Sequence, residues 1–264
     1  MRASTVTIKS EQDIEKLRIS GRLAAQVLDM IGEHVQAGVS TEYLDDLCND
    51  YIVNTLQVIP ANVGYHGFTK TTCISVNEEV CHGIPSSQKI LQDGDILNID
   101  VAVIKDGYFG DTSRMYYVGE VSPAAKKLVE TTYEAMLAGI HTVKPGATLG
   151  DIGHAIQSVA QSNGYTIVRE YCGHGIGRIY HEQPNILHYG QKGQGMTLKK
   201  GMVFTIEPMI NAGKAAIKEL NDGWTVVTQD KSLSAQWEHM VVVTDDGFEL
   251  LTPWPNGTGS YPSV

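Results

Sequence analysis

Cysteine is scarce in this chain of 264 residues. Secreted disulfide frameworks and zinc clusters depend on closely patterned cysteines, such as paired C-x-x-C motifs. No two cysteines here have that spacing, so the sequence favours neither a disulfide scaffold nor a cysteine-based zinc site. The four that are present are Cys48, Cys73, Cys81 and Cys172.

Long hydrophobic runs and an excess of positive charge are also missing. No apolar stretch approaches the roughly 20 residues that a membrane-spanning helix needs, and the N-terminus M-R-A-S-T-V-T-I-K-S lacks the apolar core of a signal peptide. The net charge of −10 argues against a surface that binds nucleic acid. We therefore expect a cytoplasmic protein that needs neither a membrane nor a specific nucleic acid.

The chain does have enough apolar residues, 42% of the total, to bury a substantial core. Apolar residues at helical spacing, together with capping residues, predict helices on both sides of a strand-rich segment, and hence an α+β fold. The predicted helices run from Ser10 to a stop at Gly38, from Ser40 or Thr41 to about Leu56, from Ser122 to about His141, and from Thr148 to about Asn163.

Residues 93–119 predict a β-hairpin. The segment Ile96–Ile104 is rich in β-branched residues, and Asp106-Gly107 is a strong signal for a type I′ turn. If that dipeptide forms the loop, Asp111 lies diagonally from Asp100 on the same face, about 7–8 Å away. Two acids on one apolar face repel each other unless a cation lies between them. The alternative is that one or both acids point to solvent at a strand end.

The second half of the chain repeats features of the first. The motif V-Q-A-G-V-S at 35–40 corresponds to V-K-P-G-A-T at 143–148, an offset of 108 residues. The motif L-Q-D-G-D-I-L-N-I-D, which ends at Asp100, corresponds to L-K-K-G-M-V-F-T-I-E, which ends at Glu207, an offset of 107. Each half therefore places an acid at the same point of a strand, as expected of an internal structural repeat.

Two further acids, Asp111 and Glu238, stand near the start of a strand in each half. We infer a single catalytic domain over residues 1–264, with pseudo-symmetric halves at about 10–120 and 121–252. Helices would lie outside and antiparallel strands at the centre. Four carboxylates that converge on the axis need about four positive charges, which two divalent cations would supply.

The nine histidines fall into three groups. His174 lies in Y-C-G-H-G-I-G, where glycines allow close approach to a ligand; a metal ligand is favoured over a phosphate cradle because no P-loop lysine is present. His82 and His181, in H-G-I-P and H-E-Q-P, suit hydrogen bonding or proton transfer on either side of a substrate. The others are assigned structural or surface positions: His34, His66, His141, His154, His188 and His239.

Several motifs resemble those of the bacterial, type I methionine aminopeptidases: C-H-G-I-P, N-I-D-V, G-D-T-S, Y-C-G-H-G-I-G, H-E-Q-P-N-I-L-H-Y, F-T-I-E-P-M and Q-W-E-H. The resemblance runs from Ile8 to about Thr252 and implies the pita-bread fold. It also implies two divalent ions, of cobalt, manganese, iron, nickel or zinc, and a monovalent cation near Asn77 and Ser234. The implied divalent-metal ligands are Asp100, Asp111, His174, Glu207 and Glu238.

The same resemblance implies removal of N-terminal methionine from nascent chains, with a preference for a small second residue. The expected protein is a monomer whose partners are a peptide N-terminus and, as a further candidate, the ribosome. Type I is favoured over type II because only 25 residues separate His181 from Glu207, which leaves no room for a helical insertion. The implied catalytic residues are His82, His181 and Glu207, and the implied substrate-binding residues are Tyr65, Phe68, Cys73, Tyr180 and Trp224, with the two histidines.

Three residues of the expected methionine pocket depart from the family pattern. The family often has cysteine at the position of Asn62, tyrosine at Phe68 and phenylalanine at Tyr180. One alternative is therefore a related aminopeptidase with an altered first-residue preference. A second is a non-catalytic binding module on the same fold, although the presence of all five implied metal ligands argues against it.

Overall fold

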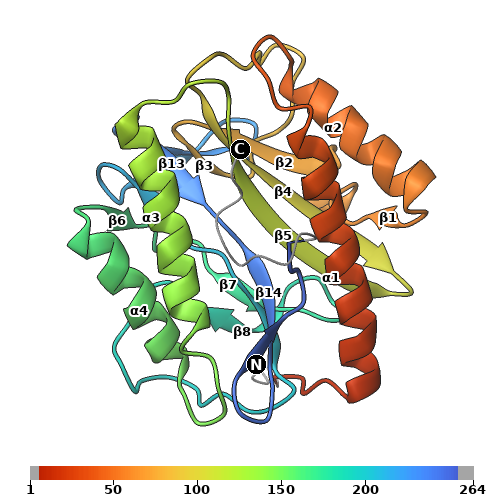
Figure 1. Cartoon of the computed structure of the whole chain (residues 1–264), viewed down its shortest axis with the longest axis vertical. Coiled ribbons are helices and arrows are strands. Elements are labelled where there is room, and N and C mark those ends of the chain that lie inside the picture. The colour runs from red at the N-terminus through yellow and green to blue at the C-terminus, as the bar shows by residue number, and fades with distance from the viewer. Residues whose placement is uncertain (1–5, 255–264) are drawn as a thin grey trace.

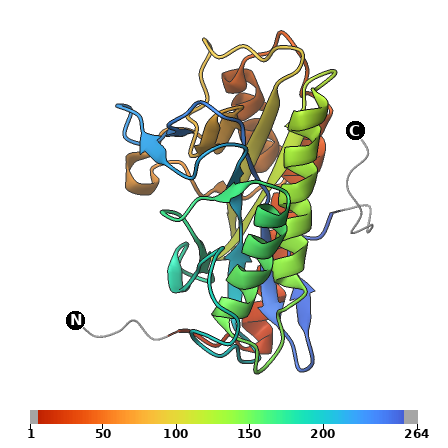
Figure 2. The same ribbon diagram turned by 90° about the vertical axis from the view of Figure 1, so that its left-hand side faces the viewer.

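The computed structural model describes residues 6–254. Four long helices lie together on one side of the molecule, and the strands and most loops lie on the other (Figures 1 and 2). Within the described residues, none of the helices has the length and apolar character needed to cross a membrane. The helices are α1 (Glu11–Gly32), α2 (Thr41–Asp50), α3 (Pro123–Ile140) and α4 (Leu149–Ser162), with a π-helical turn at Tyr51–Thr55 and a 3₁₀ turn at Tyr65–Gly67.

The strands form four small sheets in which the described pairs are antiparallel. This arrangement confirms the predicted α+β class. One sheet has the order β1-β4-β2, with β5 also paired to β4, and another has the order β15-β14-β9-β7-β8. Their strands are β1 (Ile59–Pro60), β2 (Thr72–Val76), β4 (Ile96–Lys105), β5 (Tyr108–Tyr117), β7 (Gly173–Gly175), β8 (Glu182–Ile186), β9 (Val203–Ile206), β14 (His239–Val243) and β15 (Phe248–Leu250).

Two three-stranded sheets complete the framework, with the orders β13-β10-β6 and β11-β12-β3. The hairpin of β11 and β12 projects away from the helical layer (Figure 2). These strands are β3 (Glu79–Cys81), β6 (Thr166–Ile167), β10 (Met209–Asn211), β11 (Ile217–Glu219), β12 (Val226–Thr228) and β13 (Ser234–Gln236).

The predicted β4–β5 hairpin is confirmed in its register. Asp106 and Gly107 both have positive φ, 52° and 79°, as a type I′ turn requires. Asp111 pairs with Ala102, and Asp100 pairs with Ser113. Because side chains alternate along a strand, Asp100 and Asp111 lie on one face of the hairpin.

The predicted helix boundaries agree with the structure except at the ends of α1 and α2. The helix predicted to reach about Leu56 is α-helical only to Asp50 and continues as a π-helical turn over Tyr51–Thr55. The Ser10 hydroxyl accepts from the Asp13 backbone, and the Asp13 side chain accepts from the Ser10 backbone, so a capping box starts α1 as expected. The helix ends at Gly32 rather than near Gly38. Glycine is a poor helix former, and the ring of Tyr116 packs so closely on Gly32 that a Cβ there would lie 3.1 Å from it.

The internal repeat is visible in the backbone. Ser40, which caps α2, forms an isolated antiparallel bridge with Ile90, in the segment that precedes β4. Thr148, which caps α4, forms the corresponding bridge with Thr197, in the segment that precedes β9. Flanking hydrogen bonds also recur in both halves. Gly38 N donates to Leu91 O at 2.8 Å, and Gly146 N donates to Leu198 O at 3.1 Å. The single-domain organisation and its boundary near residue 120 stay predictions.

The main hydrophobic core lies between the helical layer and the strands, and Trp237 is one of its largest fully buried side chains. Its ring packs against Tyr133 of α3 with centroids 4.9 Å apart, and its Nε1 donates to Val129 O at 3.1 Å. Because Trp237 precedes Glu238 directly, this packing holds the backbone that carries the acid against the core.

Candidate active site

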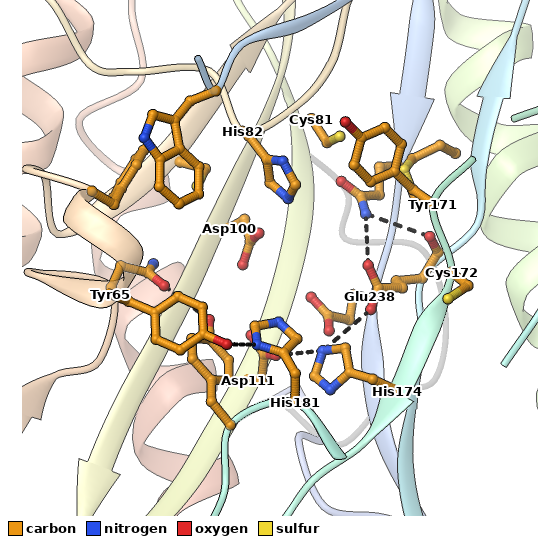
Figure 3. A pocket seen from close by; sticks show the side chains of 18 of the residues that line it. Tyr65, Cys81, His82, Asp100, Asp111, Tyr171, Cys172, His174, His181 and Glu238 are labelled. Carbon is orange, nitrogen blue, oxygen red and sulfur yellow. Dashed lines mark hydrogen bonds and ion pairs between the residues drawn. The ribbon is translucent and has the colours of Figure 1, made fainter. Parts of the chain in front are cut away.

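The residues singled out from the sequence line one cavity, with a volume of about 400 Å³. Figure 3 shows acidic side chains and three histidines pointing into it from strands and loops of both halves. All the predicted ligand, catalytic and pocket residues are brought together: Tyr65, Phe68, Cys73, His82, Asp100, Asp111, His174, Tyr180, His181, Glu207, Trp224 and Glu238. Asn62 lines the same cavity, as does the exposed His66, which was expected to be structural or on the surface.

The hairpin acids point into the cavity and away from bulk solvent. Asp111 is only 3% exposed. The Oδ1 atom of Asp100 is buried and has no hydrogen-bond partner. The alternative of solvated acids at a strand end is therefore wrong, and the unpartnered carboxylate oxygen of Asp100 has the chemistry of a cation ligand.

The two acids of the second half are held by their neighbours. Glu207 follows β9; Thr205 donates its hydroxyl to Glu207 Oε1 at 2.7 Å, and Gln236 donates to Oε2 at 3.3 Å. Glu238 is 2% exposed, and its backbone carbonyl accepts from Thr112 Oγ1 at 2.7 Å. That last bond joins the backbone before β14 to β5, so it links the two halves beside the cavity.

His174 stands between acids from both halves. Its Nε2 lies 3.4 Å from Asp111 Oδ2 and 3.5 Å from Glu207 Oε1. Gly173 and Gly175 flank it, and a Cβ at Gly173 would lie 2.3 Å from the Thr205 carbonyl oxygen. The glycines of this motif therefore serve close strand packing, which brings His174 against Glu207.

Burial and mutual repulsion make the acids resist ionisation when no cation is present. Burial, followed by the charges of Asp111 and Glu207, raises the pKa of Asp100 well above its ordinary value. Burial raises the pKa of Glu207 to about 7, with a further rise from Asp111 and opposing effects from His174 and Thr205. Burial and the same cluster of charges also raise the pKa of Glu238.

These residues fit a metal centre. Ligand atoms of Asp111, His174 and Glu238 all lie within 4.8 Å of one another. Among the described residues that line the cavity, none is lysine or arginine. Since buried anions require compensating charge, and oxygen and imidazole ligands suit divalent cations, the donor set fits one or more such ions.

Tyr65 orients His181. The Tyr65 hydroxyl lies 2.6 Å from His181 Nδ1 (Figure 3). Desolvation in the cavity, followed by the neighbouring His174 and His82, lowers the pKa of His181, and burial raises the pKa of Tyr65. The hydroxyl therefore donates, Nδ1 accepts, and the proton of the neutral ring lies on Nε2.

His82 reaches the cavity from the side opposite His181 and His174 (Figure 3). Burial lowers the pKa of His82, so this ring is also neutral at neutral pH. Its backbone has a positive φ of 56°, and its ring packs edge-on against Tyr171 and Trp224. The neutral ring is a hydrogen-bond donor, and it is a weaker acid than the imidazolium ion would be.

The pocket wall away from the acids is mainly aromatic. Phe68 and Trp224 meet edge-to-face with centroids 5.0 Å apart. Tyr180 stacks on His181 with centroids 4.2 Å apart. Cys73 completes this wall; its thiol is buried, which raises its pKa, so it is a small apolar side chain rather than a nucleophile.

Several supporting residues were not predicted from the sequence. The buried carboxylate of Asp45 on α2 accepts from the backbone N–H of both Thr71 and Thr72. These bonds hold the loop before β2, which carries Tyr65 and Phe68. Burial lowers the pKa of His188 to about 3, and its Nε2 accepts from Glu207 N at 3.1 Å. The H-E-Q-P-N-I-L-H-Y motif contains His188, but nothing in its spacing indicates that contact.

With this site described, the fold and donor set define a metallopeptidase. A profile of Metallopeptidase family M24 matches residues 15–245, so the chain belongs to that family, and it is a metal-dependent enzyme.

Within the family, the chain is similar to several methionine aminopeptidases. The chain is 56% identical over 247 residues to the methionine aminopeptidase of Escherichia coli strain K12, which covers 94% of each chain. The crystal structure of methionine aminopeptidase from Rickettsia prowazekii superposes with a TM-score of 0.92, at 55% identity, over 94% of this chain and 100% of that one. The Thermotoga maritima enzyme also gives 0.92, at 40% identity, over 94% and 99%. These matches confirm the pita-bread fold.

The raised carboxylate pKa values predict a pH-dependent stability of the metal-free protein. A carboxylate with a raised folded-state pKa favours folding below its unfolded pKa, which is 3.8 for Asp100 and 4.5 for Glu207 and Glu238. This contribution is lost as the pH rises through the raised folded-state pKa, which is about 7 for Glu207. The melting temperature of metal-free protein should therefore fall between about pH 5 and pH 8, as measured by calorimetry.

At pH 8, Mn²⁺ at about a hundred times its Kd should raise the melting temperature by about 5–10 °C. Asp111→Asn should lose most of that rise. Asp106→Asn, at the exposed tip of the same hairpin, is the matched control and should keep it. An equal rise in both variants would contradict the assignment of Asp111 as a ligand.

Proposed function

We propose that the chain removes N-terminal methionine from polypeptides by metal-assisted hydrolysis of the first peptide bond. The observation that carries this proposal is the convergence of four carboxylates, of which Asp111 and Glu238 are buried, and His174 on a cavity whose other wall is aromatic. The acids suit a pair of divalent cations, and the aromatic wall suits an unbranched apolar side chain.

Asp100, Asp111, His174, Glu207 and Glu238 would hold two divalent ions. When bound, the ions supply a nucleophilic hydroxide at neutral pH and polarise the scissile carbonyl. Glu207 accepts the proton of the attacking water, a role for which its hydrogen bonds from Thr205 and Gln236 hold both carboxylate oxygens in place. Oxygen-rich sites of this kind accept manganese, iron, cobalt, nickel or zinc according to availability.

The two histidines act on opposite sides of the scissile bond. His181 donates from Nε2 to the carbonyl oxygen as that oxygen gains negative charge, with Tyr65 holding the ring in the required tautomer. His82 donates to the leaving nitrogen. A neutral ring that carries one proton can fill either role as a hydrogen-bond donor, which is compatible with the lowered pKa values of both histidines.

The free α-amine of the substrate binds at the acidic end of the cavity, which accounts for exopeptidase action. Limited room beyond the scissile bond favours a small second residue. A monovalent cation site is proposed near Asn77 and Ser234, whose backbones are joined by a 2.9 Å hydrogen bond from Ser234 N to Asn77 O. The protein is proposed to be a cytoplasmic monomer that meets its substrate as the nascent chain leaves the ribosome.

The decisive assay compares peptides with free and blocked amines. Wild-type protein should cleave Met-Ala-Ser only after Mn²⁺ or Co²⁺ is added to chelator-treated protein. It should cleave Leu-Ala-Ser at least about tenfold more slowly, since the pocket is shaped for an unbranched side chain. N-acetyl-Met-Ala-Ser should not be cleaved, because it has no free amine. Full activity in exhaustively metal-free protein would contradict the proposal, as would equal cleavage of the acetylated peptide.

The division of labour between the histidines predicts different responses to the leaving group. His181→Ala and His82→Ala should both retain bound metal and near-normal KM, yet lose about 10²-fold or more in kcat. A methionine anilide, whose leaving group needs less help from a proton donor, should rescue His82→Ala more than His181→Ala.

Metal content and kcat for both variants on both substrates test this division. Loss of a metal ion in either variant would make that histidine a ligand instead. Equal rescue by the anilide would refute separate roles.

A further inference from the structure

Two residues of the cavity wall form a hydrogen-bonded unit that the sequence does not reveal. The Tyr180 hydroxyl donates to Asn62 Oδ1 at 2.8 Å, and Asn62 Nδ2 donates to the backbone carbonyl of Thr71 at 3.0 Å. Asn62 and Tyr180 are each only 7% exposed, and both line the cavity. The bond joins residues 118 positions apart, so it connects the two halves of the chain.

The direction of these bonds is determined by their chemistry. The Thr71 carbonyl can only accept, so the amide NH₂ of Asn62 must face it. The amide oxygen then faces Tyr180, and since that oxygen can only accept, the phenol must donate. Burial also raises the pKa of Tyr180 well above its ordinary value, which keeps the proton on the hydroxyl. The single O–H of the phenol therefore donates to Asn62 Oδ1 and to no other group.

The Tyr180 ring is held independently by aromatic contacts. It stacks on Phe109 with centroids 5.0 Å apart at 15°, and on His181 with centroids 4.2 Å apart at 30°. Removing the hydroxyl alone leaves these contacts in place. Tyr180→Phe therefore tests the hydrogen bond without disturbing the stack beside the catalytic histidine.

We propose that Asn62 determines first-residue specificity by accepting the hydrogen bond of the Tyr180 hydroxyl, which leaves the phenol no O–H to donate to a bound side chain. This inference rests on the proposed function and deepens it. It identifies why a pocket wall that contains two polar side chains, Tyr180 and Asn62, still prefers the thioether side chain of methionine. A methionine sulfur is only a weak acceptor and gains little from a donor. A first residue with a strong acceptor, such as methionine sulfoxide, would bind more tightly if the phenol O–H were free to donate to it. Such a residue is disfavoured as long as that O–H donates to Asn62.

The test uses two single variants and their combination. Asn62→Cys frees the phenol proton, because sulfur is a weak acceptor, while the thiol can still donate weakly to the Thr71 carbonyl. Tyr180→Phe removes the phenol and leaves the Asn62 oxygen as an unpaired acceptor. The double variant Asn62→Cys with Tyr180→Phe removes both partners.

Each protein, loaded with Mn²⁺, is assayed on Met-Ala-Ser and on the same peptide with methionine sulfoxide. The quantity compared is the ratio of kcat/KM for the two peptides, since a ratio within one preparation is independent of the fraction folded. In Asn62→Cys the preference for methionine should fall about tenfold, the size of one gained hydrogen bond. In Tyr180→Phe and in the double variant it should stay within about twofold of wild type, because neither has a phenol proton to donate.

A second readout is the coupling between the two positions. Each single variant leaves one buried polar group unpaired and should raise KM for Met-Ala-Ser about five- to tenfold, and the rise in the double variant should be smaller than the product of the two single effects. A ratio in Asn62→Cys that stays at the wild-type value would overturn the inference, as would an equal fall in Tyr180→Phe or effects on KM that simply multiply. Wild-type protein that cleaves neither peptide would overturn the proposed function itself.

Discussion

Repulsion among buried acids is the constraint on which this structure depends. Asp100, Asp111, Glu207 and Glu238 share one cavity, and the described residues around it include no lysine or arginine. An unpaired buried anion is costly, and the pKa values of Asp100, Glu207 and Glu238 are raised, so the cluster either keeps protons or binds cations. The folded chain thus keeps carboxylates close together at a cost in electrostatic free energy, and a bound divalent cation would offset this repulsion. The M24 family membership is consistent with that use.

The fold supports this strain through contacts remote from the acids themselves. Trp237 anchors the backbone before Glu238 in the core, and Thr112 joins that backbone to β5. Asn98 donates to the Gln236 carbonyl at 2.8 Å and so ties β4 to the same segment. Because the repeat brings corresponding strands of the two halves together, each half contributes acids to one site, and neither half alone would complete it.

Local chemistry and internal symmetry account for what could be predicted from the sequence. The Asp106-Gly107 turn determines the hairpin register, and that register alone places Asp100 and Asp111 together. The match of Asp100 to Glu207 indicated the second pair of acids. The end of α1 was missed: the helix stops at Gly32, where the Tyr116 ring of β5 packs, and this contact between distant segments leaves no signal in the local sequence. Asp45, His188 and the bond between Asn62 and Tyr180 were also missed, since they join distant segments and leave no periodic pattern in the sequence.

We propose that acids from both halves jointly hold two divalent cations, and anomalous diffraction from crystals grown with Mn²⁺ is the sharpest test of this site. The account predicts two manganese peaks about 3.5–4 Å apart. Asp111 and Glu238 should contact both ions, with His174, Asp100 and Glu207 completing the coordination. A single peak, or peaks held by acids of only one half, would contradict it.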